Sequence, residues 1–422
     1  MKNNLANTNL NLAFFSRVLM AGVILISAFL LFQVQPLMAK FILPWFGGAA
    51  AVWTICMLFY QVSLLMGYCY VHFSVSYLKK RNQAILHGIL LIIAFYFLPL
   101  RPDELQTSEI SSNPVRGVLY VLTLSIGIPF FVISATSSLI QSWHSRIVPN
   151  SSPYPLYALS NLGSMVALLS YPFLIETNFK LIDQTTYWSL GYDIFILLFL
   201  ILTIYFAMVT WGDSHKSVDV KVDKNKEKDK PILWCLLAAT ASILLLSISD
   251  HLSRDVAAIP FLWVIPLSLY LLSFILCFES DRWYRRQIFI PMVFILVAIS
   301  SLEMVDIIDI QFFAQITLYC GLLFAVCMVC HGELVGLRPP SKRLARFYLV
   351  IAAGGAIGGI FVGLVAPMIF VIPLELHFGI ALMLLLIGVI LFNDPLSKFH
   401  KGQGRITWMG MAIFLGLFIY GI

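Results

Sequence analysis

Charged residues are scarce in this sequence. Asp, Glu, Lys and Arg make up 11% of its 422 residues, hydrophobic residues make up 60%, and the mean hydropathy is +0.90. A soluble globular protein could not bury so much apolar surface, so this composition excludes that class and indicates a membrane protein. The formal net charge of +6 falls in the loops between apolar runs, which argues against nucleic-acid binding.

The sequence also lacks the motifs of several enzyme classes. It has no phosphate-binding P-loop, no dinucleotide-binding glycine fingerprint after a strand and no recognisable catalytic triad, so we assign no catalytic residue. Most of the seven cysteines lie in apolar runs, where they act as small buried hydrophobes. Cys327, Cys330 and His331 have the spacing of a haem-attachment motif, but they lie in an apolar helix, and no second Cys/His pair has zinc-ligand spacing. The sequence therefore predicts no cofactor and no metal.

Thirteen apolar runs are long enough to cross a bilayer, which takes roughly 20 residues per helix. Each must be a helix, because a lone strand in lipid would leave its backbone groups unpaired. The expected spans are 18–34, 49–74, 84–100, 117–140, 154–175, 186–209, 232–250, 258–278, 287–302, 312–332, 347–371, 374–392 and 406–421.

Positive charge is sorted into alternate gaps between these runs. Of the 27 Lys and Arg residues, all but five lie in the N-terminal tail and the even-numbered gaps. The exceptions are Lys40, Arg101, Arg116, Lys180 and Arg254. This bias is typical of a multi-pass protein and predicts a cytoplasmic N-terminus. Thirteen spans place the C-terminus outside; if residues 406–421 lie along the membrane instead, it returns inside and the bundle is six plus six.

A charged segment divides the chain. Residues 212–231, GDSHKSVDVKVDKNKEKDKP, predict a hydrated cytoplasmic linker between an N-terminal six-helix bundle (1–211) and a C-terminal bundle of six or seven helices (232–422). The halves also share a pattern: Tyr157-x3-Asn161-x-Gly163-Ser164 is echoed by Tyr348-x3-Ala352-x-Gly354-Gly355. An even number of spans separates the two copies, so we expect two parallel six-helix repeats, as in the major facilitator fold.

Polar residues inside membrane spans are costly and are therefore the first candidates for function. In the N-terminal half these are Gln33, Gln35, Lys40, Gln61, Gln141 and Asn161. Pro36 is expected to break or kink the first span, so that the segment up to Pro44 forms a re-entrant or interfacial stretch. Lys40 either extends to the lipid headgroups, or serves as a charge partner or an anion contact. Gln61 either joins helices or contacts a substrate.

The C-terminal half adds His331 and Glu333, near the inner end of the tenth span. Glu333 is the acid most suggestive of function in this half. It either binds a cation or a proton, or forms an internal ion pair with Arg338 or Arg343. His331 and Glu333 are also the general-base candidates if the chain is a membrane-embedded enzyme, although no nucleophile accompanies them.

Four segments resemble one known family. Residues 29–70, which include FQVQPLMAKFILPWFGG (32–48), together with residues 153–176, 255–279 and 330–359, look like the bacterial fused major-facilitator/spermidine-synthase-like membrane proteins. The resemblance implies an inner-membrane protein with a major-facilitator-like membrane part. In that family a soluble domain similar to spermidine synthase commonly follows, and no such domain occurs within these 422 residues.

The expected function is transporter-like, with a polyamine or related small organic solute suggested by the resemblance. In this reading the glutamines hydrogen-bond the solute and Glu333 compensates its charge. Two alternatives stand beside it. The first is a membrane scaffold or partner subunit for a separately encoded synthase-like or methyltransferase-like enzyme, and the second is a membrane-embedded enzyme.

Overall fold

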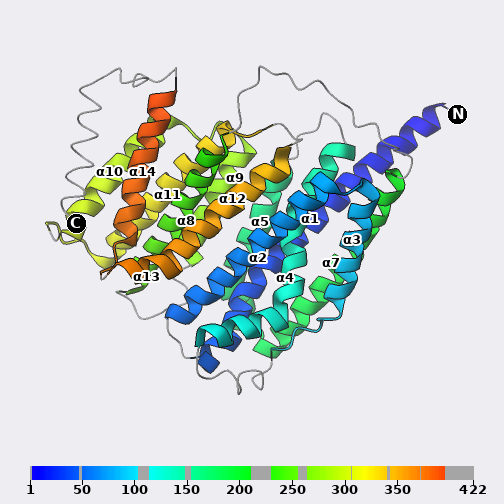
Figure 1. The fold of residues 1–422 in the computed structure, drawn as a ribbon, viewed down its shortest axis with the longest axis horizontal. Helices are drawn as coiled ribbons and strands as arrows, with labels where there is room; N and C mark the ends of the chain where they lie inside the picture. Colours follow the sequence, from blue (N-terminus) through cyan, green and yellow to red (C-terminus); the bar gives the residue numbers. More distant parts are fainter. Residues whose placement is uncertain are drawn as a thin grey trace. The chain divides into compact units, whose positions relative to one another are not determined.

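The computed structural model describes residues 2–46, 50–102, 114–147, 154–210, 230–254, 264–305, 307–339, 343–370 and 372–394. Every regular element in these ranges is a helix. Most of the expected linker and the whole expected span 406–421 lie outside the described residues. Each of the other expected spans coincides with a helix, and Figure 1 shows the order of these helices along the chain.

Ten helices in the described residues are long and apolar enough to cross a membrane. The prediction of an all-α, multi-pass membrane protein is therefore confirmed. Two expected spans differ in their bounds: the helix at 84–100 covers Lys80–Phe95, and the described part of 258–278 is a helix over Val264–Glu279. In the first of them the chain leaves the helix before Pro99 and Pro102, where proline cannot continue a helical backbone.

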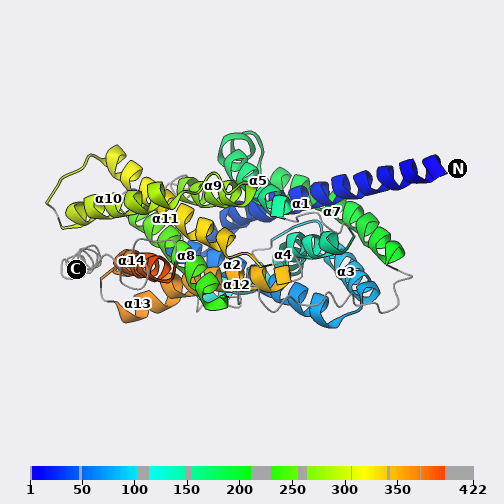
Figure 2. The same ribbon diagram turned by 90° about the horizontal axis from the view of Figure 1, so that it is seen from above.

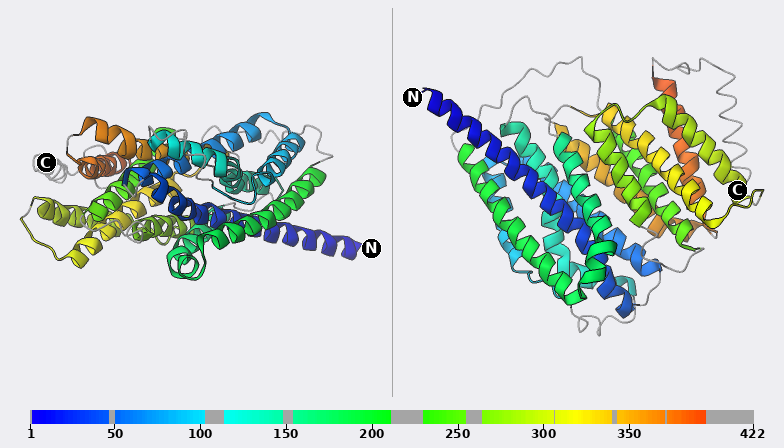
Figure 3. Two further views of the ribbon diagram at one scale, coloured as in Figure 1. Left: turned by 90° about the horizontal axis from the view of Figure 1, so that it is seen from below. Right: turned by 180° about the vertical axis from the view of Figure 1, so that it is seen from behind.

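By packing, the chain forms two compact units. The first comprises Met1–Pro231 and Arg338–Ala352. Its helices are α1 (Lys2–Phe46), α2 (Ala50–Tyr77), α3 (Lys80–Phe95), α4 (Pro114–Ile147), α5 (Tyr154–Ser170), the π-helical segment η2 (Tyr171–Ile175), α6 (Glu176–Asn178), α7 (Leu181–Val209) and the first part of α12 (Leu344–Ile360). Helix α1 packs against α2, α4, α5 and α7, and α3 packs against α7 (Figure 3).

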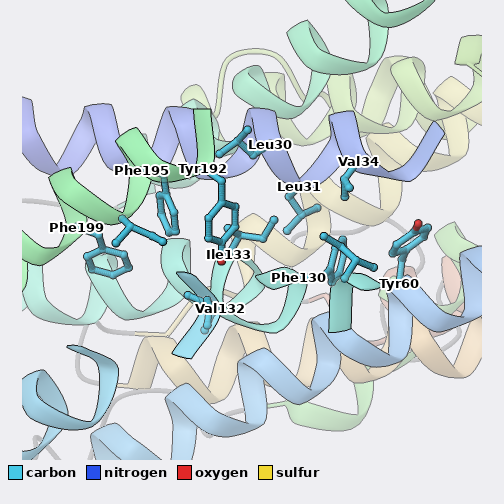
Figure 4. Packing of buried hydrophobic residues seen from close by; sticks show 14 of the residues in the cluster. Leu30, Leu31, Val34, Tyr60, Phe130, Val132, Ile133, Tyr192, Phe195 and Phe199 are labelled. Carbon is cyan, nitrogen blue, oxygen red and sulfur yellow. The ribbon is translucent and has the colours of Figure 1, made fainter. Parts of the chain in front are cut away.

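The core of the first unit is built from large apolar side chains of α1, α4 and α7 (Figure 4). Tyr192, Phe195 and Phe199 on α7 are fully buried. The Tyr192 hydroxyl reaches α4, where it donates a 2.9 Å hydrogen bond to the carbonyl oxygen of Pro129. A buried hydroxyl away from water needs such a partner, so this bond fixes the position of α7 on α4.

The second unit comprises Ile232–Leu337 and Ala353–Ile422. Its described helices are α8 (Pro231–Arg254), α9 (Val264–Glu279), α10 (Arg286–Met304), α11 (Phe312–Gly336), the end of α12, the π-helical segment η4 (Phe361–Val365), α13 (Ala366–Ile369) and α14 (Glu375–Asn393). Helix α11 packs against both α9 and α10 (Figure 2). Nearly all of α11 from Leu318 onward is buried, so this helix is the centre of the unit.

A helix pair recurs in the two units. Helices α5 and α12 are both 17 residues long, and each runs into a five-residue π-helical segment. A Cβ atom at Gly163 on α5 would meet the Leu25 carbonyl oxygen and the Ala28 side chain, both on α1. A Cβ atom at Gly354 on α12 would meet the Cys235 carbonyl oxygen and the Ala238 side chain, both on α8. Small residues let membrane helices approach closely, and here they do so at matching places.

The expectation of a broken or re-entrant stretch after the first span is wrong. Helix α1 continues from Lys2 to Phe46 with Pro36 and Pro44 inside it. Leu37, Met38 and Ile42 are buried against neighbouring helices. Such packing, rather than local propensity, keeps a proline-containing membrane helix continuous.

Candidate functional site

In the first unit, a buried glutamine is hydrogen-bonded to one of three clustered tyrosines. Gln141 on α4 is fully buried, and its Nε2 atom donates a 3.0 Å hydrogen bond to Ser137. Tyr348 on α12 donates its hydroxyl proton to Gln141 Oε1 at 2.6 Å. The Tyr348 ring stacks on Tyr157 of α5 at a centroid distance of 4.8 Å and lies 6.4 Å from the Tyr68 ring of α2. We call Gln141, Tyr68, Tyr157 and Tyr348 the tyrosine–glutamine cluster.

This cluster joins four helices through groups that can bind an organic solute. The amide supplies hydrogen-bonding atoms, and the tyrosine rings supply flat faces that stack on apolar or cationic groups. The sequence singled out Gln141 as a candidate, whereas it marked Tyr157 and Tyr348 only as matching positions of the repeat. Residues 338–352 belong to the first unit although they follow the linker by more than a hundred positions, so spacing alone does not predict this contact.

The other two polar candidates of this unit outside α1 behave differently. The Gln61 Oε1 atom on α2 is buried and has no hydrogen-bond partner among the described residues. Asn161 on α5 is half-buried and donates to the Tyr157 carbonyl oxygen at 3.0 Å, within its own helix. Asn161 is therefore satisfied locally, and Gln61 retains an acceptor for a ligand.

The three candidates on α1 have three different environments. Gln35 is buried and donates to the Leu31 carbonyl oxygen of the same helix at 3.3 Å. Gln33 is also buried, but neither its Nε2 nor its Oε1 atom has a hydrogen-bond partner among the described residues. Lys40 pairs with Glu176 at 2.5 Å, and both side chains are about one-third exposed. Lys40 thus has a protein partner rather than an open anion site.

Glu333 forms an ion pair in the second unit. Arg286, the first residue of α10, binds both Glu333 carboxylate oxygens at 2.6 Å, in the bidentate geometry that guanidinium favours. Another nitrogen of Arg286 binds Asp394. The internal ion pair was one of two alternatives for Glu333, but its partner is Arg286 rather than Arg338 or Arg343. Arg286 stands 47 positions upstream, so sequence proximity favoured the wrong arginines.

Tyr284 completes this group. Its hydroxyl donates a 2.7 Å hydrogen bond to Glu333 Oε1. Burial, together with the Glu333 carboxylate, raises the pKa of the Tyr284 phenol far above its ordinary value, so the phenol remains a donor. A Cβ atom at Gly332 would overlap the Tyr284 ring, so glycine at this position is what lets the ring lie on α11. A cavity of about 290 Å³ adjoins Tyr284, Arg286 and Glu333.

His331 is buried in the same unit. Its Nδ1 atom lies 2.8 Å from the Ser273 hydroxyl of α9, and its ring stacks on Phe274 at 3.6 Å between centroids. Cys327 and Cys330 are buried near it as free thiols. His331 therefore has the contacts of a core residue that joins α11 to α9.

Comparisons with known proteins give similarities of structure. No protein-family model matches the chain, and no curated protein matches it in sequence. The chain is similar to the major facilitator superfamily proton:xylose symporter XylE bound to 6-bromo-6-deoxy-D-glucose, with a TM-score of 0.48 and 12% identity, over 96% of this chain and 94% of that one. A double-tryptophan mutant of XylE gives a TM-score of 0.45 and 13% identity, over 97% and 95% of the two chains.

Proposed function

We propose that this chain is a transporter-like protein that moves a small organic solute across a bacterial cytoplasmic membrane, with its N-terminus inside. The observation that carries this proposal is the tyrosine–glutamine cluster. Gln141 is fully buried in a helix of membrane-spanning length, yet it is hydrogen-bonded to a tyrosine from a distant part of the chain. Polar groups at such positions are costly and mark solute or ion pathways.

The two kinds of group in the cluster suit a solute with both apolar and polar parts. Tyrosine faces bind apolar or cationic portions, and the amide discriminates among hydrogen-bonding groups. Gln61 lies on α2, the helix that carries Tyr68, and its buried Oε1 acceptor has no hydrogen-bond partner among the described residues. Membership of the fused major-facilitator/spermidine-synthase-like family, proposed from the sequence segments, agrees with a membrane part of this type.

A polyamine is the more specific solute that the family resemblance suggests. Tyrosine rings would attract its ammonium groups. Glu333 is a weaker partner than the sequence suggested, because Arg286 and Tyr284 already hold both of its oxygens. A polyamine would have to displace a bidentate guanidinium to reach this carboxylate, so we assign Glu333 to the stability of the second unit.

A thermal-shift screen tests the proposal. The purified protein in detergent is heated with spermidine, amino acids, nucleosides, sugars and S-adenosylmethionine analogues. A solute that binds the folded state raises the melting temperature with its concentration. We expect one class to stabilise the wild type and a Tyr120→Phe control, whose ring is exposed on α4, but not Tyr348→Phe. If no solute stabilises the wild type, the proposal is wrong and the scaffold role gains support.

A further inference from the structure

A cavity that does not include the tyrosine–glutamine cluster lies within the first unit between α1, α5 with η2, and α7. Its volume is about 730 Å³, within the range of about 300–1,000 Å³ that is typical of small-molecule sites. The wall is mainly apolar, with Phe29, Leu37, Leu162, Val166 and Trp188 among its residues. Figure 3 shows α1 running beside α5 and α7, the helices that form this wall.

Gln33 differs from the other polar side chains in this wall. Its side chain is only 6% exposed, and both its Nε2 and Oε1 atoms are buried without a hydrogen-bond partner in the part of the chain that the structure describes. An amide left unpaired in an apolar setting is destabilising, because it has lost its hydrogen bonds to water without replacing them. One ligand group that both accepts and donates a hydrogen bond would remove this penalty.

The other buried polar side chains of the wall are already paired. The Tyr171 hydroxyl donates to Gln184 Oε1 at 3.1 Å, and Gln184 Nε2 donates to the Phe179 carbonyl oxygen at 2.8 Å. Trp188 donates to the Leu30 carbonyl oxygen at 2.9 Å. Among the described buried polar side chains of this wall, Gln33 is therefore the one available to recognise the polar group of a ligand.

The cavity wall carries no net charge. None of its described lining residues is Asp, Glu, Lys or Arg. Lys40 lies 5.6 Å from the Tyr171 ring centroid, but its charge is balanced by Glu176. A charged head group would lose its hydration here without gaining a counter-ion, so the site favours an uncharged ligand.

The repeated helix pair shows that the fold does not require a polar residue at this place. Leu25 and Ala28 on α1 correspond to Cys235 and Ala238 on α8, because each pair contacts the matching glycine of its unit. At the same offset along the chain, Gln33 corresponds to Ile243. Ile243 is 3% exposed in the core of the second unit. An apolar side chain fills the equivalent position there, so helix packing does not explain the buried amide in the first unit. A bound ligand does explain it.

The edge of the cavity indicates where the ligand comes from. Three lining residues, Leu25, Leu162 and Val166, are also 39–48% exposed. On helices that cross a membrane, exposed apolar side chains face lipid. We infer that this cavity binds an uncharged lipid-like amphiphile from the bilayer, with its hydroxyl or amide head hydrogen-bonded to Gln33 and its chain along α5 and α7.

Photolabelling in proteoliposomes tests this inference without depending on transport. The probe is a monoacylglycerol with a diazirine in its acyl chain, and labelled peptides are mapped by mass spectrometry. We expect the probe to label peptides of α1, α5 and α7. Excess 1-monooleoylglycerol should suppress this labelling, and a water-soluble solute found by thermal shift should not. Suppression by that solute alone would identify the cavity as a solute site and overturn the lipid assignment.

Matched variants identify the head-group contact. Gln33→Met should lower labelling about tenfold, which corresponds to a loss of about 1.4 kcal/mol in binding free energy. Gln35→Met is the control and should leave labelling unchanged, because the Gln35 amide donates its hydrogen bond within its own helix. Val166→Trp fills the cavity from a half-exposed wall position and should also abolish labelling. Each variant is first checked for a monodisperse elution profile. Equal labelling of the wild type, Gln33→Met and Val166→Trp would overturn the inference.

Discussion

Gly163 and Gly354 make the same contact in the two units, each bringing its helix against the carbonyl oxygen of a residue on a partner helix. A methyl group at Gly354 would overlap the Cys235 carbonyl and crowd Ala238. Gly354→Ala should therefore lower stability by about 1–3 kcal/mol, as overpacking does.

Gly355 provides the control for this prediction. Apart from its own stretch of helix, no described atom lies within 4 Å of a Cβ added there, and its carbonyl oxygen accepts a hydrogen bond from the Ser242 hydroxyl. Gly355→Ala should keep or slightly raise the melting temperature, because alanine favours helix more than glycine does. Equal melting temperatures for the two variants would show that close approach of α12 to α8 is not what fixes this pair.

Glu333 and Arg286 should behave as a coupled pair. Glu333→Gln leaves the guanidinium with Asp394 alone and should reduce the free energy of unfolding by about 1–3 kcal/mol. Arg286→Met leaves a buried carboxylate and should destabilise more. In a double-mutant cycle measured by thermal or denaturant unfolding, the double variant should lose less than the sum of the single losses.

The pair of Arg282 and Glu279 is the exposed comparison for this cycle. Its side chains are 69% and 51% exposed, and the closest charged atoms lie 3.8 Å apart. Such a surface pair contributes about 0–1 kcal/mol, so Arg282→Gln should change the melting temperature little. Strict additivity at positions 286 and 333 would contradict the ion pair described here.

Tyr348→Phe should lower stability by about 1 kcal/mol, because it leaves the buried Gln141 oxygen without its strongest described partner. Tyr348→Phe combined with Gln141→Leu removes both polar groups and should recover part of that loss. The measurement is unfolding monitored by tryptophan fluorescence in detergent. No recovery in the double variant would argue against a direct hydrogen bond between the two side chains.

Lys40→Gln should have a small effect. Lys40 and Glu176 are each about one-third exposed, and pairs of this kind contribute at most about 1 kcal/mol. The variant should keep its melting temperature within a few degrees and bind solute as the wild type does. A loss of solute binding with unchanged stability would restore the anion-contact role that the sequence left open for Lys40.

Apolar runs were sufficient to predict the helices, because length and hydropathy decide whether a segment can cross a bilayer. The continuity of α1 through Pro36 was not predictable, since it depends on packing by other helices. The bond between Tyr348 and Gln141 was also missed: Tyr348 stands 207 positions further along the chain, and only the folded first unit brings it to α4. Gln33 and Gln35 look alike in sequence, but only the structure shows that one amide is satisfied and the other is not.

Solute counterflow in proteoliposomes tests the transport proposal most directly. Vesicles that contain the purified protein are loaded with unlabelled stabilising solute and diluted into a trace of labelled solute. We predict transient accumulation with the wild type and Tyr120→Phe, and at least a tenfold slower initial rate with Gln141→Leu and Tyr348→Phe. Absence of counterflow by the wild type, or full rates in both cluster variants, would contradict a solute path through the tyrosine–glutamine cluster.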